Sequence, residues 1–379
     1  MTDALVIGSG PSGLATGAEL VKRGIDVTVL ERGERTASAW AGRYDGLRFN
    51  TSRWWSALPG APFPRTYGWF PTRDQYVHYL DDYAAARHVP VRHSVAVERI
   101  DPAPEGGWNV TATGKSFHTR HVVVATGVFN VPWLPDWARG DRTPPKVLHA
   151  SDYHNATPYR GLRVLVVGAG STGMEIAREL ADGAAQVSLS VRTAPNILLR
   201  SSGGLPGDLA VPLILRLPTD LADSFLATVQ HATIGDLSPY GLTSPPAGVI
   251  AQLRERGAGT AVVDKEVIDA IRDGGIRIVA AVDGLDEQGA QLVDGSHVGA
   301  DVVIAATGYT TGLREMAGHL DVLDARGLPR VVDGGEVMTG LRFVGYVLRP
   351  GLTGYTGKLA RVAARGIAAA RDDMAAVAS

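Results

Sequence analysis

The chain has 379 residues, of which 45% are hydrophobic, and a formal net charge of -2 at pH 7. This length allows two or three domains, and this composition can bury a full core. The near-neutral charge and the lack of a long run of one sign argue against nucleic acid or an anionic membrane as the main partner. The expected substrate is therefore a small molecule.

The chain contains no cysteine. This excludes a redox-active cysteine pair, structural disulfides and thiolate metal sites, and it fits a reducing cytosol. The first predicted strand begins without a basic, apolar leader, and no apolar run approaches the ~20 residues of a membrane span. We therefore expect a cytoplasmic protein with no membrane partner.

The first motif is a glycine turn that follows a predicted strand at residues 4–7 and precedes an apolar helix face. Gly8 would form the tight turn, Gly10 would let the backbone approach a pyrophosphate, and Gly13 would let helix and strand pack closely. Pro11 and Ser12 stand at the helix N-terminus, which favours a phosphate. The pattern predicts a dinucleotide site.

The next predicted strand, residues 25–30, ends at Glu31, about 20 residues after the glycines, where a carboxylate accepts hydrogen bonds from a ribose 2′-hydroxyl. An aromatic and basic loop follows, and loops of this kind are commonly functional. We include Arg32, Trp40 and Arg48 among the candidate cofactor contacts. For Trp40, core packing is the commoner role of such a residue.

Further along, Thr72 and Gln75 form a capping-box signature before a predicted helix with a tyrosine-rich face. Residues 89–97 and 108–113 are expected to be strands. A buried strand beginning at His121 then ends in a turn that contains Thr126 and Gly127, and a proline-rich connector follows from Val131 to Pro145. This strand and turn would close the first nucleotide-binding unit.

A second copy of the glycine motif begins at Arg163 and reads as a complete strand, turn, helix and strand. Two copies in register are much stronger evidence than one match. The candidate cofactor residues of its turn are Gly168, Gly170, Ser171, Thr172 and Gly173.

The two copies differ where their second strands end. In place of a carboxylate, the second copy has Val191 followed by Arg192, a pair that suits a 2′-phosphate better than a free ribose. We therefore predict FAD at the first site and NADPH at the second, with Arg192 on the 2′-phosphate. Thr172 and Arg200 are weaker candidates for the same role.

Residues 193–259 form the least periodic region, which would either vary with the substrate or act as a structural cover. Regular structure is expected again from Val267 to Val279, and a hairpin from Gln291 leads to a buried strand that ends in Thr307 and Gly308. That strand and its Ala-Thr-Gly turn repeat those at Thr126 and Gly127. The internal repeat is therefore complete.

Near the C-terminus, a strand at residues 341–346 precedes a glycine-rich turn at residues 350–354 and a predicted helix. Free backbone N–H groups at Leu352 and Thr353 would stabilise negative charge on a reduced flavin, although a plain domain-closing helix is the alternative.

We thus predict an α/β protein with two Rossmann-like dinucleotide-binding domains, for FAD and NADPH. The second domain would be inserted into a discontinuous first domain. The predicted boundaries are 1–155 for the first part of the FAD domain, 156–308 for the NADPH domain and 309–379 for the closing part.

The segment just before the second glycine motif resembles the signature of flavin-containing monooxygenases. His149 and Tyr153 occupy its histidine and aromatic positions, whereas Thr143, Pro145 and His154 depart from its Phe, Gly and basic positions. Further similarity lies in Asn50-Thr-Ser52, Pro62-Phe-Pro64, Ala306-Thr-Gly-Tyr309 and Phe343-Val-Gly-Tyr346. Several other segments are most similar to the plant auxin-forming (YUCCA-type) branch and its bacterial relatives: Val191-Arg192, Ile197 to Arg200, Tyr240 to Leu242, Val263-Asp264 and Phe343 to Gly354.

This resemblance implies a class B flavin monooxygenase, in which NADPH reduces FAD, O2 adds to the flavin at C4a, and the peroxyflavin oxygenates a small organic substrate. Asn50 would hydrogen-bond near the flavin and the nicotinamide; without the resemblance it would be taken for a loop-capping residue. The reaction would be N- or S-oxygenation, or oxidative decarboxylation of a 2-oxo acid. A homodimer would follow family habit.

Two alternatives stay open at this point. The first is an NADPH-dependent electron-transfer reductase without redox cysteines, and the second is a nucleotide-sensing flavoprotein without catalysis. No metal site is expected, because His118 and His121 flank a strand start without a matching carboxylate motif.

Overall fold

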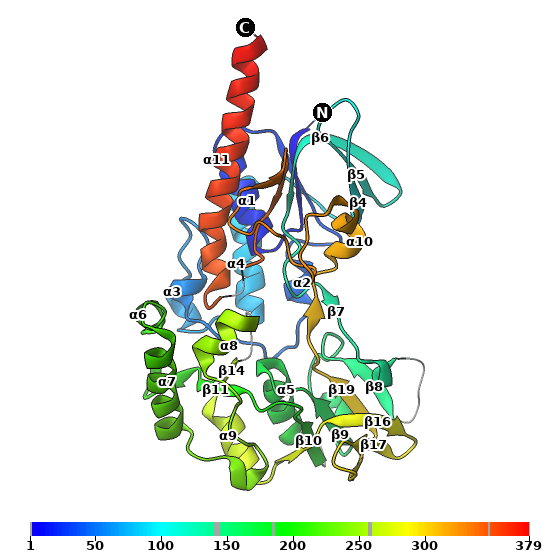
Figure 1. Ribbon diagram of the computed structural model, residues 1–379, viewed down its shortest axis with the longest axis vertical. Helices are drawn as coiled ribbons and strands as arrows, with labels where there is room; N and C mark the ends of the chain where they lie inside the picture. The colour runs from blue at the N-terminus through cyan, green and yellow to red at the C-terminus, as the bar shows by residue number, and fades with distance from the viewer. Residues whose placement is uncertain (1, 140–144, 184–185, 257–259, 348, 379) are drawn as a thin grey trace.

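Figure 1 shows the protein as a computed structural model. The structure describes residues 2–139, 145–183, 186–256, 260–347 and 349–378. The signature position Thr143 lies outside these ranges. Within them, the chain forms two main sheets, which occupy the upper and lower halves of the view in Figure 1.

The first sheet has a parallel core in the order β3-β2-β1-β6-β22, with β21 antiparallel to β22 and the β4-β5 hairpin joined to β6. Its strands come from both ends of the chain: β1 (Thr2–Ile7), β2 (Val27–Leu30), β3 (Val91–Arg92), β4 (Val97–Pro102), β5 (Trp108–Ala112), β6 (Lys115–Val124), β21 (Glu336–Met338) and β22 (Leu341–Phe343).

The second sheet is parallel throughout, in the order β15-β10-β9-β19-β8. Its strands come from the middle of the chain: β8 (Lys146–His149), β9 (Arg163–Val167), β10 (Gln186–Ser190), β15 (Ile276–Val279) and β19 (Val302–Ala305). The buried strand expected just before Thr307 and Gly308 is therefore present, as β19.

The chain passes between the sheets twice, and the two passages pair with each other. It leaves the first sheet after β6 through β7 (Val131–Pro132) and returns after β19 through β20 (Tyr309–Thr310), which is antiparallel to β7. Because β8 pairs with β19, the second sheet begins upstream of the boundary predicted at residues 155–156. The edge strand of the second sheet, β8, comes before the glycine motif in the chain. The order of motifs along the sequence does not show that β8 pairs with β19.

Alternation along β1 explains how the first sheet is covered on both faces. Ala4 and Val6 pack in one core cluster with α1 (Pro11–Val21), α4 (Arg73–Ala86) and α11 (Leu352–Ala378), whereas Leu5 and Ile7 pack in another with α10 (Leu313–Ala317) and the β4-β5 hairpin. Figure 1 shows α11 running beside α1 along one side of the molecule. These layers hold the C-terminal ends of the parallel strands in place.

The capping box predicted for α4 is confirmed. The Thr72 hydroxyl accepts the Gln75 N–H at 3.3 Å, and the Gln75 side-chain oxygen accepts the Thr72 N–H at 3.0 Å. Tyr76, Tyr79 and Tyr83 of this helix are buried, as the helical spacing predicted.

Residues 193–259 are more regular than predicted. In the described part they contain β11 (Asn196–Leu199), β12 (Ser201–Ser202), β13 (Leu205–Pro206), α6 (Val211–Ile214), α7 (Thr219–Thr233) and α8 (Val249–Arg256). Helix α7 buries only Ala222 and Leu226, while Leu221 and Phe225 are 62% and 50% exposed. The sequence pattern failed here because an exposed apolar face removes the contrast that marks an amphipathic helix.

The remaining α-helices and β-strands of the described ranges include the helix of the second glycine motif, α5. They are α2 (Ser38–Ala41), α3 (Arg53–Ser56), α5 (Ser171–Ala181), α9 (Lys265–Arg272), β14 (Thr260–Val263), β16 (Val282–Asp286), β17 (Gly289–Leu292) and β18 (His297–Gly299). The predicted hairpin is confirmed as β17 and β18, which pair antiparallel. In the described ranges no helix has the length and apolar character needed to cross a membrane.

Candidate active site

The first glycine turn connects β1 to α1 and is closed by backbone packing. Gly8 has φ +100°, and a Cβ on Gly13 would lie 1.8 Å from the Gly8 carbonyl oxygen. Over Gly10, by contrast, no atom lies within 4 Å of a Cβ position. Gly10 is the N-cap of α1 and offers no side-chain cap, so the first N–H groups of the helix remain available to an anion.

The second glycine turn, between β9 and α5, has the same geometry. Gly168 has φ +113°, a Cβ on Gly173 would lie 1.8 Å from the Gly168 oxygen, and the space over Gly170 is open. Gly170 caps α5 without a side-chain hydrogen bond. The Ser171 hydroxyl accepts the Val262 N–H at 2.9 Å, while Thr172 is half-buried beside it. Both turns therefore present an uncapped helix end beneath open space.

Glu31 lies at the end of β2, where the sequence placed it, but protein donors already surround its carboxylate. It accepts hydrogen bonds from the Ser9 N–H at 3.0 Å, the Ser9 hydroxyl at 2.5 Å, the Gly33 N–H at 2.9 Å and the Ser38 hydroxyl at 2.6 Å. Burial opposes ionisation, but the hydrogen bonds from Ser38, Ser9 and Gly33 outweigh it and lower the pKa of Glu31. The carboxylate is thus a fixed acceptor.

Arg192 stands at the matching strand end of the second sheet and is exposed. Among the described residues it has no hydrogen-bond or ion-pair partner. Val191 anchors this point of the chain through its N–H, which donates to the Val279 carbonyl at 3.0 Å. An unpaired guanidinium at this place is suited to bidentate contact with a phosphate.

The two Ala-Thr-Gly turns lie beside the glycine turns and are braced differently. The Thr126 hydroxyl and the Tyr346 hydroxyl are 2.8 Å apart, and Gly127 has open space above it. In the second turn, the Thr307 hydroxyl donates to the Trp133 carbonyl at 2.5 Å, and the Gly308 carbonyl accepts from His149 at 2.9 Å.

His149 is buried, and its surroundings assign its protonation. The Ser151 N–H donates to Nδ1 at 3.0 Å, so Nδ1 is an acceptor and Nε2 must carry the proton that it donates to Gly308. Burial lowers the pKa of His149 and keeps the ring neutral, although the bond to Gly308 acts in the opposite direction. Tyr153, the aromatic position of the signature, is fully buried and stacks on Tyr159. Both residues brace the second sheet.

Other predicted contacts are spread around the first turn. Trp40 packs in an aromatic cluster, with its ring 5.3 Å from Phe49 and 4.7 Å from Tyr76, which is the packing alternative considered for it. Arg32 and Arg48 are exposed. Leu352 and Thr353 form the first turn of α11, directly after Gly351 with φ +67°.

Arg200 differs most from expectation, because it is 4% exposed and both of its terminal nitrogens have partners within the protein. It forms ion pairs with Glu175 of α5 and with Asp264, and its Nη2 donates to the Asn50 side-chain oxygen at 3.3 Å. Such pairing leaves Arg192 as the better candidate for a phosphate. Sequence analysis gave Glu175 no role and named Asp264 only as part of a family resemblance; the one local signal was a carboxylate two residues after Gly173.

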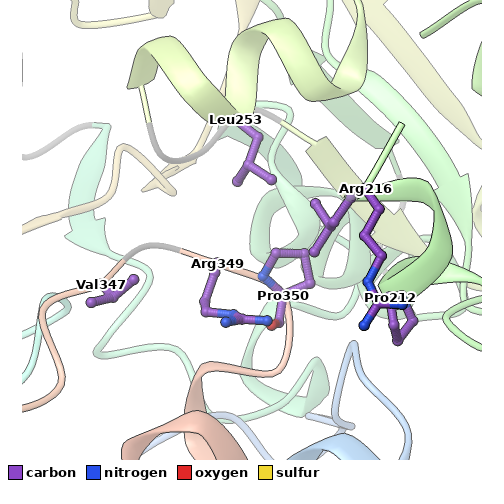
Figure 2. Close-up of a pocket in the computed structure, with 7 residues that line it drawn as sticks. Pro212, Arg216, Leu253, Val347, Arg349 and Pro350 are labelled. Atoms are coloured by element: carbon purple, nitrogen blue, oxygen red, sulfur yellow. The ribbon is translucent and has the colours of Figure 1, made fainter. Parts of the chain in front are cut away.

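A pocket of about 500 Å³ opens between α6, α8 and the chain before α11. Figure 2 shows the residues that line it: Pro212, Leu215, Arg216, Leu253, Val347, Arg349 and Pro350. Its wall is mostly apolar but carries two guanidinium groups, a combination that fits an apolar molecule with a negatively charged end. No group of metal-ligating side chains is found in the residues that the structure describes.

Comparisons with known proteins identify the family to which this chain belongs. The model of the pyridine nucleotide-disulphide oxidoreductase family matches residues 5–198. The indole-3-pyruvate monooxygenase YUCCA1 of Oryza sativa is 37% identical over 82% of this chain and 77% of that protein. The probable indole-3-pyruvate monooxygenase YUCCA8 of Arabidopsis thaliana is 31% identical over 95% of this chain and 87% of that protein. The chain belongs to the YUCCA-type flavin monooxygenases.

Solved structures share this fold over nearly the whole chain. A flavin-containing monooxygenase from Stenotrophomonas maltophilia aligns with a TM-score of 0.71 at 23% identity, over 98% of this chain and 99% of that one. A steroid monooxygenase bound to NADP aligns with a TM-score of 0.75 at 18% identity, over 99% of this chain and 86% of that one. Because the chain belongs to the YUCCA-type family, the protein is an oxidoreductase of the flavin monooxygenase class. Because the chain has no cysteine, the disulphide chemistry in the name of the broader family is excluded.

Proposed function

We propose that this monooxygenase binds FAD at the Gly8–Gly13 turn and NADPH at the Gly168–Gly173 turn. The observation that carries the proposal is the pair of uncapped helix ends beneath open space, one beside Glu31 and the other beside Arg192. A carboxylate selects a free ribose, and a guanidinium selects a 2′-phosphate. A flavin reduced by NADPH supplies the activation of O2 when bound.

In this proposal the first sheet and its helices form the FAD domain, and the second sheet with its helices forms an inserted NADPH domain. The natural boundaries are the paired passages β7 and β20 instead of residue 155, because β8 belongs to the second sheet. A two-stranded joint of this kind would keep the two glycine turns in a fixed relation.

Asn50 is proposed as the amide that donates a hydrogen bond near the flavin and the nicotinamide. It is exposed, and its oxygen already accepts from Arg200, so its N–H2 group is left as the donor. The candidate cofactor contacts of the first site also include Leu352 and Thr353, whose helix N-terminus favours negative charge.

The substrate we propose is a small apolar molecule with a carboxylate, with a 2-oxo acid as the first class to test. The pocket with Arg216 and Arg349 supports an anionic end, and the two YUCCA relatives are named for a 2-oxo acid. Amines and sulfides form the competing class. Cytoplasmic location and a homodimer stay predictions of the sequence.

The test is rapid-mixing absorbance of the flavin-loaded protein, reduced with NADPH and then mixed with O2 without substrate. We expect a long-lived absorbing species that differs from both reduced and oxidised flavin. Direct return to oxidised flavin would favour the electron-transfer reductase instead. Failure to bind flavin in the presence of excess FAD would overturn the cofactor assignment.

A further inference from the structure

The strand pair β12-β13 is a small hairpin that fixes two charged residues at its base. Gly203 and Gly204 form its turn with φ of +58° and +79°, the positive values that a two-residue hairpin turn requires. The Gly207 N–H donates to the Arg200 carbonyl at 2.9 Å and closes the base. Arg200 and Asp208 therefore flank the hairpin, one just before β12 and the other two residues after β13.

Both flanking residues contact the loop that contains Asn50. Arg200 donates to the Asn50 side-chain oxygen at 3.3 Å, and the Asp208 carboxylate accepts the Ser52 N–H at 2.5 Å. Asp208 is 8% exposed and Ser52 is fully buried. The loop is thus held at two points, once through a side chain and once through the backbone.

The contact with Arg200 also decides which way the Asn50 amide is turned. A guanidinium has only donors, so the amide atom that faces it must be the oxygen. The Asn50 N–H2 group then points to another partner, and it has no hydrogen bond with the part of the chain that the structure describes. Arg200 itself is fixed by Glu175 and Asp264, which prevents it from following the amide if the amide turns over.

We propose that Arg200 and Asp208 form a clamp that positions the Asn50 amide as a donor toward a bound flavin or nicotinamide. This inference rests on the proposed function of Asn50. It gives residues 200–208 a positioning role in place of the phosphate contact expected for Arg200. Because Glu175 belongs to α5, the clamp is anchored on the helix that begins at the second glycine turn.

The clamp itself is tested by hydrogen exchange, read by mass spectrometry on the peptide Arg48–Ser56 of the flavin-loaded protein. Asp208→Ala removes the acceptor of the Ser52 N–H, and we expect that amide to exchange at least about tenfold faster. Arg277→Met is the control, since Arg277 is exposed and its side chain makes no contact given for the described residues. Equal exchange in the wild type and Asp208→Ala would overturn the clamp.

Its effect on Asn50 is tested by a double-mutant cycle with Arg200→Lys and Asn50→Ala. Lysine keeps the charge beside Glu175 and Asp264 but lacks the planar fork that reaches all three partners. We expect Arg200→Lys to accelerate flavin reoxidation without substrate by about fivefold, and to add nothing when Asn50 is already alanine. Independent, multiplying effects would show a merely structural role and overturn the inference.

The two readouts separate the inference from the function on which it rests. If Asn50→Ala leaves reoxidation unchanged, the proposed role of Asn50 fails, and the positioning role of the clamp fails with it. Exchange at Ser52 still reports whether Asp208 holds the loop. Thermal unfolding of each variant, compared with that of Arg277→Met, confirms that the measured protein is folded.

Discussion

The two glycine turns have almost the same backbone but differ in what stands beside them. In both, a Cβ on the last glycine would meet a carbonyl oxygen at 1.8 Å, and the middle glycine faces open space. Beside the first turn, however, Glu31 is buried and bonded to Ser9, Gly33 and Ser38, whereas beside the second turn Arg192 is exposed and unpaired within the described residues.

This difference indicates that the turn and the strand end have separate tasks. In the proposed function, the turn supplies a helix end that would accept any diphosphate, because it acts through backbone N–H groups. The strand end would select the nucleotide through one side chain. A preorganised carboxylate suits a cofactor that stays bound, and an exposed guanidinium suits one that exchanges.

The largest effect should come from filling the closed side of either turn. Gly13→Ala and Gly173→Ala each place a methyl group on a backbone oxygen, so we expect the free energy of unfolding to fall by about 3 kcal/mol or more. Urea unfolding measures it. Gly10→Ala and Gly170→Ala should stay within about 1 kcal/mol, since their space is open. Equal losses of stability at all four positions would contradict the finding that the last glycine of each turn is closely packed and the middle glycine is not.

Arg192→Gln should change coenzyme preference at the second site and leave the first site unaffected. Loss of a charge-assisted contact with the 2′-phosphate should lower the preference for NADPH over NADH by about 10- to 100-fold, or about 1.5–3 kcal/mol. The measurement is kcat/KM for each coenzyme, with Arg277→Gln as the exposed control. An unchanged ratio would remove Arg192 from the site, and flavin affinity should not change in either variant.

Glu31→Gln should weaken the first site and change its response to pH. The amide keeps the shape but loses charge, so we expect FAD affinity and stability at neutral pH to fall by about 1–2 kcal/mol. The folded pKa of Glu31 is lowered, so its stabilising contribution is present above 4.5 and is lost as the pH falls from there through the folded pKa. The free energy of unfolding of the wild type and of Glu31→Gln is measured at neutral pH and well below pH 4.5. The difference between the two proteins should be smaller at the lower pH. An equal difference at both pH values would contradict the conclusion that Glu31 is ionised in the folded protein.

The smallest effect concerns the bracing of the second Ala-Thr-Gly turn. Burial lowers the pKa of His149 below 6.5, so the folded state prefers the neutral ring and loses stability as the pH falls below 6.5, until the folded pKa is passed. His149→Asn should flatten this part of the stability curve, measured by urea unfolding at several pH values. The first Ala-Thr-Gly turn is braced by Tyr346, which does not titrate in this pH range. The effect of Tyr346→Phe on the free energy of unfolding should therefore not change with pH there.

Local patterns revealed much of the fold, for reasons visible in particular residues. Gly8 and Gly168 could be recognised because a turn of this shape excludes side chains, and the Thr72 capping box because its two partners lie three residues apart. Helix α7 was missed because its apolar residues Leu221 and Phe225 are exposed. The position of β8 in the second sheet was missed because the strand at the edge of a sheet can come from a distant part of the chain.

The sequence by itself determined the repeat, the absence of cysteine chemistry and the contrast between Glu31 and Arg192, since each depends on residue type at a short, fixed spacing. Only the tertiary structure decided the role open to Arg200. Its partners Glu175, Asp264 and Asn50 lie 25, 64 and 150 positions away in the chain, and a buried charge takes its function from the groups that fold around it.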